Sequence, residues 1–126
     1  MNTRKKGKFW EKVVARFWIK FFGATCIDIA RSVKFQDNDF FSMFDIIAFV
    51  PINSHHWIQV TCKDMKAKKK KILNNFPYWD NQFLALYDDK NNMLTIERRY
   101  KDCWAHILDF EATEIVNEIK KKKTTK

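Results

Sequence analysis

The sequence is poor in glycine and proline, the residues that most often interrupt regular structure. It has two of each among 126 residues, so long flexible linkers are not expected. Phosphate-binding loops of the GxGxxG and Walker types need closely spaced glycines, and the sequence excludes both motifs. We therefore expect one folded domain over residues 1–126, without a nucleotide cofactor.

Cysteines are few, and long apolar runs are missing. Cys26, Cys62 and Cys103 are widely separated and form no CxxC pair, which favours a reducing compartment over a disulfide framework. No apolar run approaches the roughly 20 residues that a transmembrane helix needs. The basic start at residues 1–6 resembles that of a signal peptide, but charged residues interrupt the apolar segment after it. We expect a soluble, cytoplasmic protein that does not enter the membrane.

Positive charge is present in excess. The formal net charge of +9 indicates a polyanionic partner, with nucleic acid as the first expectation and an anionic membrane surface as the second. Lysines in this number suit phosphate contacts that do not depend on base sequence, although a charged face also serves solubility alone. The expected nucleic-acid contacts are Arg4, Lys5, Lys6, Lys8, Lys34, Lys66, Lys68, Lys69, Lys70, Lys71, Arg98 and Arg99.

Hydrophobic periodicity predicts an α/β domain. Apolar residues repeat at helical spacing over 8–22, and Gly23 is suited to end that helix. Apolar or alternating runs predict strands, and the polar segment 36–39 predicts a turn. The predicted strands are 24–33, 44–50, 56–63, 82–87 and 93–100. The other predicted helices are 64–76 and 110–120. A basic arm at 1–7 precedes these elements, and a disordered basic tail at 120–126 follows them. This order predicts a mixed central sheet flanked by helices.

The strand predicted over 56–63 has polar residues on one face. Core packing gives no reason for such residues on a buried strand, so we expect a ligand or a reaction beside them. An acid, Asp45, opens the preceding apolar strand. Period-two alternation points Trp57, Gln59, Thr61 and Lys63 one way, and Ile58, Val60 and Cys62 the other.

These motifs, in this order, resemble the PD-(D/E)xK nuclease superfamily. The resemblance consists of a first helix with Glu11, a strand that opens with Asp45, an apolar strand with Gln59-x-Thr61, and a basic helix. It covers roughly residues 8–100 of the chain. The superfamily includes restriction endonucleases and archaeal Holliday-junction resolvases, so the resemblance implies a restriction-endonuclease-like α-β-β-β-α-β-β core.

Two shorter segments resemble small phage- and virus-encoded members of this group. They are Ser-Val-Lys-Phe-Gln at 32–36, before the Asp45 strand, and Ile-Gln-Val-Thr at 58–61, followed by lysines. The resemblance implies a DNA partner, either duplex or branched like a Holliday junction. It also implies a homodimer, because a junction presents two symmetric strands.

The resemblance further implies a metal-dependent endonuclease that hydrolyses phosphodiesters with Mg²⁺ or Mn²⁺. Asp45 would be the first metal ligand, Gln59 stands at the position of the second acid, and the carbonyl of Val60 would be the backbone ligand. Glu11 would be the supporting acid of the first helix. Gln59 brings no charge, and Thr61 replaces the usual lysine, so the expected catalytic cation is Lys63, two residues further on. Glu11, Asp37 or Asp39 could restore the missing carboxylate.

Other interpretations of the same residues stay open. The structural ones are a strand cap for Asp45, a buried amide for Gln59, a solvated side chain for Lys63 and an exposed helix position for Glu11. Two alternative functions also remain. One is a catalytically inactive DNA-binding protein of nuclease fold, and the other is a basic protein that binds membrane surfaces through helix 8–22.

Overall fold

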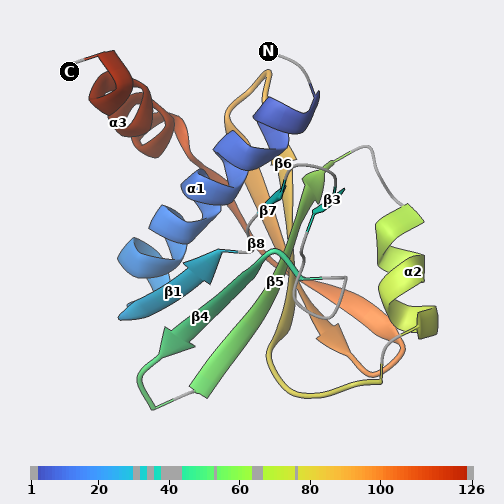
Figure 1. Cartoon of the computed structure of the whole chain (residues 1–126). Helices are drawn as coiled ribbons and strands as arrows, with labels where there is room; N and C mark the ends of the chain where they lie inside the picture. The colour runs from blue at the N-terminus through green and yellow to red at the C-terminus, as the bar shows by residue number, and fades with distance from the viewer. Residues whose placement is uncertain are drawn as a thin grey trace.

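The fold is mixed α/β, with one six-stranded sheet and helices on both of its faces (Figure 1). The computed structural model describes residues 3–29, 32–33, 36–37, 44–52, 54–63, 67–75 and 77–124. Within these residues the strand order of the main sheet is β1-β4-β5-β6-β7-β8. The predicted class, a mixed sheet flanked by helices, is confirmed.

Helix α1 (Thr3–Phe22) covers one face of the sheet. Its apolar stripe is buried, and Phe17 and Trp18 have no solvent exposure. Gly23 follows in the left-handed region (φ 74°), which suits a residue without Cβ at the end of a helix. The helix begins at Thr3 rather than at residue 8, so residues 3–7 are helical instead of forming an arm. Lysine is a good helix former, which allows this extension.

The first half of the sheet is antiparallel. Its strands are β1 (Cys26–Ile29), β4 (Ile46–Val50) and β5 (Ser54–Cys62). In the β4–β5 register, Ile46 lies opposite Ile58. This pairing brings the start of β4, where Asp45 lies, beside the polar part of β5.

The predicted strand 24–33 is interrupted. The segments β2 (Ser32–Val33) and β3 (Gln36–Asp37) form a separate two-stranded sheet instead. Gln36 and Asp37, expected in a turn, therefore pair as a short strand with Val33 and Ser32. The rest of the predicted turn, residues 38–39, lies outside the described residues.

A helix joins the antiparallel half to the second half of the sheet. Helix α2 (Ala67–Asn75) connects β5 to β6 (Gln82–Asp88), which pairs parallel to β5. A parallel connection needs such a crossover. Strands β7 (Met93–Tyr100) and β8 (Cys103–Glu111) complete the sheet in antiparallel register.

Strand β8 was absent from the sequence prediction, which started a helix at residue 110. Its register with β7 shifts beside Ile96, so that Leu108 and His106 lie opposite consecutive residues of β7 and Ile107 is extra. This bulge breaks the period-two pattern by which strands are recognised. Bulges of this kind also protect the exposed edge of a sheet from pairing with other chains.

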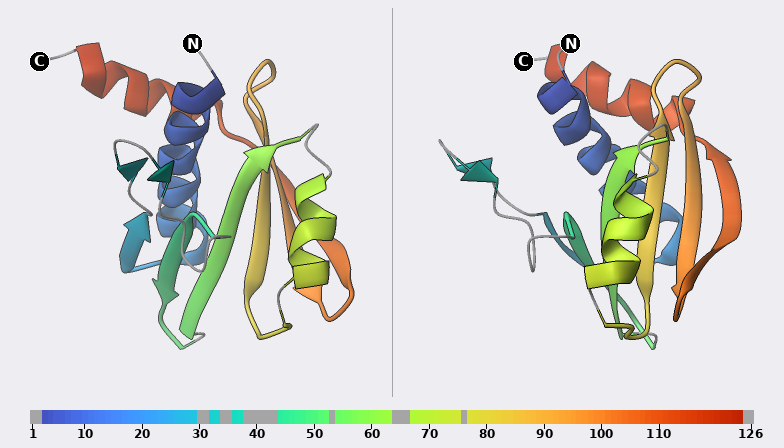
Figure 2. Two further views of the ribbon diagram at one scale, coloured as in Figure 1. Left: turned by 45° about the vertical axis from the view of Figure 1, so that its right-hand side comes forward. Right: turned by 90° about the vertical axis from the view of Figure 1, so that its right-hand side faces the viewer.

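Helix α3 (Thr113–Thr124) begins three residues later than predicted and takes in lysines expected in a disordered tail. Lysines near a helix C-terminus interact favourably with the helix dipole, which supports this longer helix. Figure 2 shows α1 and α3 on one side of the strands and α2 on the other. The apolar residues of α3 (Ile115, Val116 and Ile119) join the core under α1.

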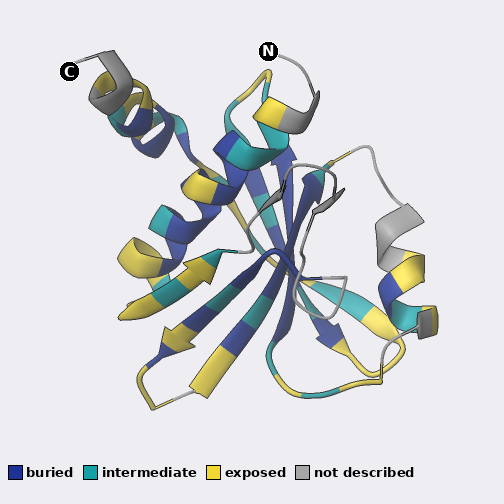
Figure 3. Ribbon diagram, in the orientation of Figure 1, coloured by how far each residue is buried: buried dark blue, intermediate teal, exposed yellow. Residues whose placement is uncertain are grey.

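Two apolar clusters hold the layers together. The larger lies between α1, α3 and the sheet, and it includes Ile58 and Val60 of β5. The smaller lies on the opposite face, where Phe44 and Ile72 of α2 are fully buried against Trp57, Trp79 and Trp104. The buried residues accordingly run through the middle of the sheet and along the inner side of α1 (Figure 3).

Candidate functional site

Asp45 lies at the start of β4 with its carboxylate directed at the backbone of β5. The side chain is 6% exposed, and Oδ2 accepts a hydrogen bond of 2.8 Å from the amide of Val60. The backbone of Asp45 also donates to the carbonyl of Ile58, at 2.9 Å. The carboxylate is therefore buried at the junction of two strands and held by main-chain contacts.

Gln59 and Thr61 lie on the sheet face that points away from α1. Their neighbours Ile58 and Val60 belong to the core beneath α1, and alternation directs Gln59 and Thr61 to the other side. Both side chains are buried, with exposures of 1% and 5%. The side-chain amide of Gln59 donates to the carbonyl of Val60 at 3.2 Å, so the expected backbone ligand already accepts one hydrogen bond. That carbonyl keeps a second lone pair.

Glu11 is buried on the sheet side of α1, with 8% exposure. Its Oε1 lies 3.6 Å from the ammonium of Lys8, one turn earlier in the helix. The alternative interpretation of Glu11 as an exposed helix residue is therefore wrong, because this turn of the helix packs against the sheet.

Tyr87 of β6 connects the buried acids. Its ring stacks on Trp10 of α1 at 5.2 Å between centroids. Burial raises the pKa of the Tyr87 hydroxyl, and the charges of Cys62, Asp89, Glu11 and Asp45, in decreasing order, raise the pKa further. Glu11 and Asp45 make the two smallest of these contributions, and Glu11 and Asp45 come from different elements, α1 and the start of β4.

Lys63 follows the end of β5 and is exposed. Its backbone amide donates to the carbonyl of Tyr87 at 2.9 Å. The pKa of Asp109 is held low first by a hydrogen bond from Thr95 and, to a smaller extent, by the charge of Lys63. The Lys63 ammonium thus acts on the sheet face away from α1, the side on which Gln59 and Thr61 lie.

The predicted DNA-contacting residues fall into several groups. Lys5, Lys6 and Lys8 are exposed or half-buried at the start of α1, and Lys70 and Lys71 are exposed on α2. Arg4 lies in α1, and Lys68 and Lys69 lie in α2, without described side chains. Lys34 and Lys66 lie outside the described residues.

The two arginines at the end of β7 have structural contacts. Arg99 is 2% exposed, and its guanidinium donates to Gln82 at 2.8 Å, to the carbonyl of Lys101 at 2.8 Å and to that of Pro77 at 3.3 Å. Burial lowers its pKa. Arg98 is partly exposed and bonds Asn81 at 3.1 Å. The expectation that Arg99 contacts nucleic acid from the surface is wrong, because its side chain anchors the loop before β6.

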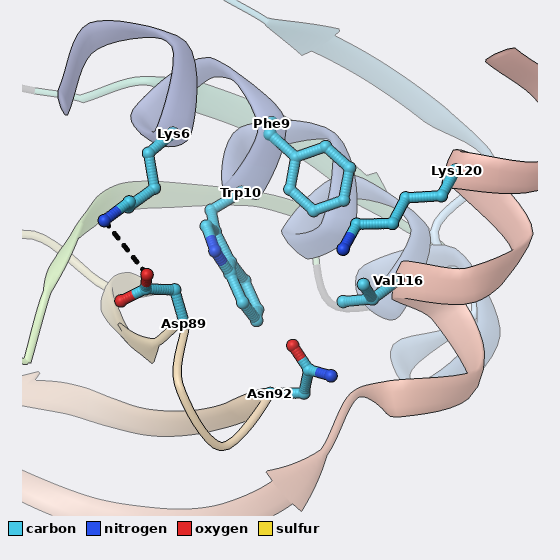
Figure 4. Close-up of a pocket in the computed structure, with 7 residues that line it drawn as sticks. All are labelled: Lys6, Phe9, Trp10, Asp89, Asn92, Val116 and Lys120. Atoms are coloured by element: carbon cyan, nitrogen blue, oxygen red, sulfur yellow. Dashed lines mark ion pairs between the residues drawn. The ribbon is translucent and has the colours of Figure 1, made fainter. Parts of the chain in front are cut away.

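A pocket of about 230 Å³ lies where α1, the β6–β7 turn and α3 meet (Figure 4). Its lining consists of Lys6, Phe9, Trp10, Asp89, Asn92, Val116 and Lys120. Trp10 separates this pocket from Tyr87, on which it stacks. The sequence did not predict this arrangement, because its residues come from three segments that no local pattern connects.

The described residues show no group of three or more His, Cys, Asp or Glu side chains that could hold a metal ion. None of the described helices is long and apolar enough to span a membrane. No protein-family model, curated protein or solved structure matches this chain. Its function is therefore inferred from the chain's own geometry.

Proposed function

We propose that this chain is a metal-dependent DNA endonuclease with a restriction-endonuclease-like core. The order of elements supports the proposal. A first helix precedes an antiparallel β1-β4-β5 unit, and a crossover helix then leads to a strand parallel to β5. This is the order that the sequence resemblance implies. Topology alone does not define an activity, because one fold hosts many functions.

The observation that carries the proposal is the buried carboxylate of Asp45 beside the polar residues of β5. A buried charge is costly unless hydrogen bonds or a cation compensate it. Asp45 has a main-chain hydrogen bond at 2.8 Å from Val60, and the neighbouring β5 side chains Gln59 and Thr61 are buried as well. A buried carboxylate that opens one strand beside the polar residues of the next is the arrangement that the sequence resemblance implies for a metal ligand.

The residues present fit Mg²⁺ or Mn²⁺ in their chemistry. Both ions prefer oxygen ligands, and Asp45, the amide oxygen of Gln59 and the carbonyl of Val60 offer oxygen where β4 meets β5. Glu11 lies on the α1 side of the sheet, away from the Gln59 side chain. Such an ion, when bound, polarises a phosphate and lowers the pKa of a bound water. Asp45 would hold the ion, and Lys63, two residues after Thr61, would stabilise the negative charge that develops on the phosphate. The substrate would be duplex or branched DNA, and a homodimer would suit a junction.

A cleavage assay with matched acid variants tests this proposal. Labelled four-way junction, duplex and single-stranded DNA are incubated with Mg²⁺, Mn²⁺ or EDTA. We expect metal-dependent cutting that falls at least ~100-fold in Asp45→Asn, while DNA binding in EDTA stays within about threefold. Asp28→Asn, an exposed acid in β1, is the control and should cut normally. Cutting that persists in Asp45→Asn would assign the chemistry to other residues.

A second candidate function is a catalytically inactive DNA-binding protein of the same fold. The observation in its favour is that Gln59 and Thr61 lie on the face away from α1, whereas Glu11 lies on the α1 side. In addition, the Gln59 amide is engaged with its own strand. This candidate predicts DNA binding that EDTA does not change, and no cutting by the wild-type protein with either metal.

The structure disfavours the alternative function of binding to membrane surfaces. It required the aromatic face of α1 to be available to lipid. In the structure Trp10, Phe17 and Trp18 are at most 2% exposed because this face packs on the sheet. The lysines remain a surface for polyanions, which leaves nucleic acid as the preferred partner.

A further inference from the structure

The start of α1 and the second half of α3 lie close together, although they are far apart in sequence. The N-terminal turns of α1 and the C-terminal turns of α3 lie at the same end of the molecule (Figure 1). The Lys120 ammonium lies 5.9 Å from the centre of the Phe9 ring. Glu118 of α3 also accepts from Arg16 of α1 at 3.2 Å and from Lys20 of α1 at 2.7 Å, so the two helices lie side by side.

The pocket opens into this surface, with a lysine on either side of it. Figure 4 shows Lys6 and Lys120 on opposite sides of the hollow, with Trp10 and Asn92 between them. Lys6 pairs with Asp89 at 2.9 Å, and both side chains are 34% exposed. An ion pair this exposed has little net stability, so a phosphate can take the place of the Asp89 carboxylate at Lys6.

Lysines outnumber acids around the pocket. Among the lining residues and their direct neighbours in sequence, the lysines are Lys5, Lys6, Lys8, Lys90, Lys120 and Lys121, and the acids are Glu11, Asp88 and Asp89. We name these six lysines the terminal lysine surface. Ammonium groups contributed by three elements suit an extended polyanion better than a single small anion.

The lysines of α2 lie on the opposite face of the sheet. Ile72 of α2 packs with Trp57, which alternates with the Ile58 that faces α1. Lys70 and Lys71, next to Ile72, are exposed, and we name this pair the α2 lysine surface. The sheet therefore separates two basic surfaces.

We propose that the terminal lysine surface is a second nucleic-acid-binding surface, whose pocket receives a backbone phosphate between Lys6 and Lys120. One molecule then holds two nucleic-acid segments, one on each face of the sheet. This inference rests on the proposed function only in taking nucleic acid as the partner, and it needs no catalysis. It gives branched DNA a physical advantage over a single duplex, because two arms can engage both surfaces of one molecule.

A bridging assay in EDTA tests the proposal without cleavage. A bead-bound duplex captures the protein, and retention of a second, fluorescent duplex measures bridging. Anisotropy with a single duplex gives the affinity over a salt series. The variants are Lys6→Ser/Lys120→Ser for the terminal surface and Lys70→Ser/Lys71→Ser for the α2 surface. Lys12→Ser/Lys101→Ser removes the same charge at two exposed positions outside both surfaces and serves as the control, and circular dichroism checks the folding of each variant.

We expect each surface variant to lose bridging at least ~10-fold while it keeps single-duplex binding through the other surface. The slope of log affinity against log salt should also become shallower by about one to two units. The control should bridge like the wild-type protein. A terminal-surface variant that bridges as well as the control would overturn the proposal. That result is also the one expected if a dimer bridges two duplexes with one α2 lysine surface on each copy.

Two further outcomes separate this proposal from the endonuclease. Bridging without any metal-dependent cutting would leave the second surface in place and remove the nuclease. Metal-dependent cutting of DNA without bridging would support the endonuclease and overturn the second binding surface. In the Lys70→Ser/Lys71→Ser variant only the terminal lysine surface remains, so bound duplex can be competed with anionic vesicles or with free duplex. If the vesicles compete more strongly than the free duplex, the terminal surface binds lipid and the proposal is overturned.

Discussion

His56 shows how one side chain depends on several distant parts of the chain. It is 3% exposed, accepts a 3.0 Å hydrogen bond at Nδ1 from the indole of Trp18, and stacks on Phe83 at 4.7 Å. Burial, with a smaller effect from the charge of Arg98, lowers its pKa from 6.5 to about 4. The neutral ring is therefore a component of the core.

This shift predicts a loss of stability in mild acid. Between pH 6.5 and pH 4 the unfolded chain takes up a proton at His56 that the folded protein does not. The stabilisation is fully present above pH 6.5 and is lost as the pH falls toward 4. The free energy of unfolding should drop by about 2 kcal/mol between pH 7 and pH 5, measured by urea denaturation.

A pair of adjacent histidine variants isolates the effect. His56→Gln cannot titrate in this range and keeps a hydrogen-bond acceptor for Trp18, so its unfolding free energy should be nearly flat from pH 7 to pH 5. His55→Gln, at an exposed position in the same strand, should keep the wild-type drop. Equal pH dependence in both variants would show that His56 is not the titrating group.

How far the candidate site could be predicted also differs by residue. The alternation of β5 was enough to place Gln59 and Thr61 on the face opposite Ile58 and Val60. The burial of Glu11 could not be derived, because it depends on how closely α1 approaches the sheet. Tyr87 was missed for a similar reason, since its neighbours come from four separate segments and it reads locally as one aromatic residue of a strand.

At the scale of elements, the turn between β4 and β5 contains a strained residue. Ile52 has a φ of 76° and is fully exposed. A β-branched residue in the left-handed region costs roughly 1–2 kcal/mol, and glycine avoids this cost. Ile52→Gly should therefore raise the free energy of unfolding by about 1 kcal/mol, measured by thermal and urea denaturation.

The same exchange in a helix is the matched control. Ile19 is half-exposed in α1, where glycine is a poor helix former. Ile19→Gly should lower the free energy of unfolding by roughly 0.5–1 kcal/mol. If both variants were destabilised to the same extent, backbone strain at Ile52 would not be the cause.

Strands and helices with regular patterns were predicted well, and those with defects were not. The limits of β7 agree with the predicted 93–100, where the polar turn at 88–92 marks the start and Leu94 and Ile96 alternate with polar residues. Strand β8 escaped prediction because the extra residue Ile107 changes the phase of the pattern halfway along. The short β2 and β3 escaped because two-residue strands have no measurable period.

At the scale of the whole molecule, the net charge of +9 should destabilise the compact state. Like charges on a small domain repel one another, and salt screens this repulsion over a distance of about 10 Å at 0.1 M. We expect the melting temperature to rise by several degrees when NaCl increases from about 0.02 M to about 0.5 M. Calorimetry in the absence of nucleic acid measures this directly.

A charge variant decides whether repulsion is the cause. Lys70→Glu/Lys71→Glu changes the net charge from +9 to +5, because each exchange removes one positive charge and adds one negative charge. It should melt higher than wild type at low salt and respond less to NaCl. Lysines that lower stability when the protein is alone would support the proposed polyanionic partner. A melting temperature that did not change with salt would show that the lysines do not destabilise the protein, and the net charge would then no longer favour a nucleic-acid partner.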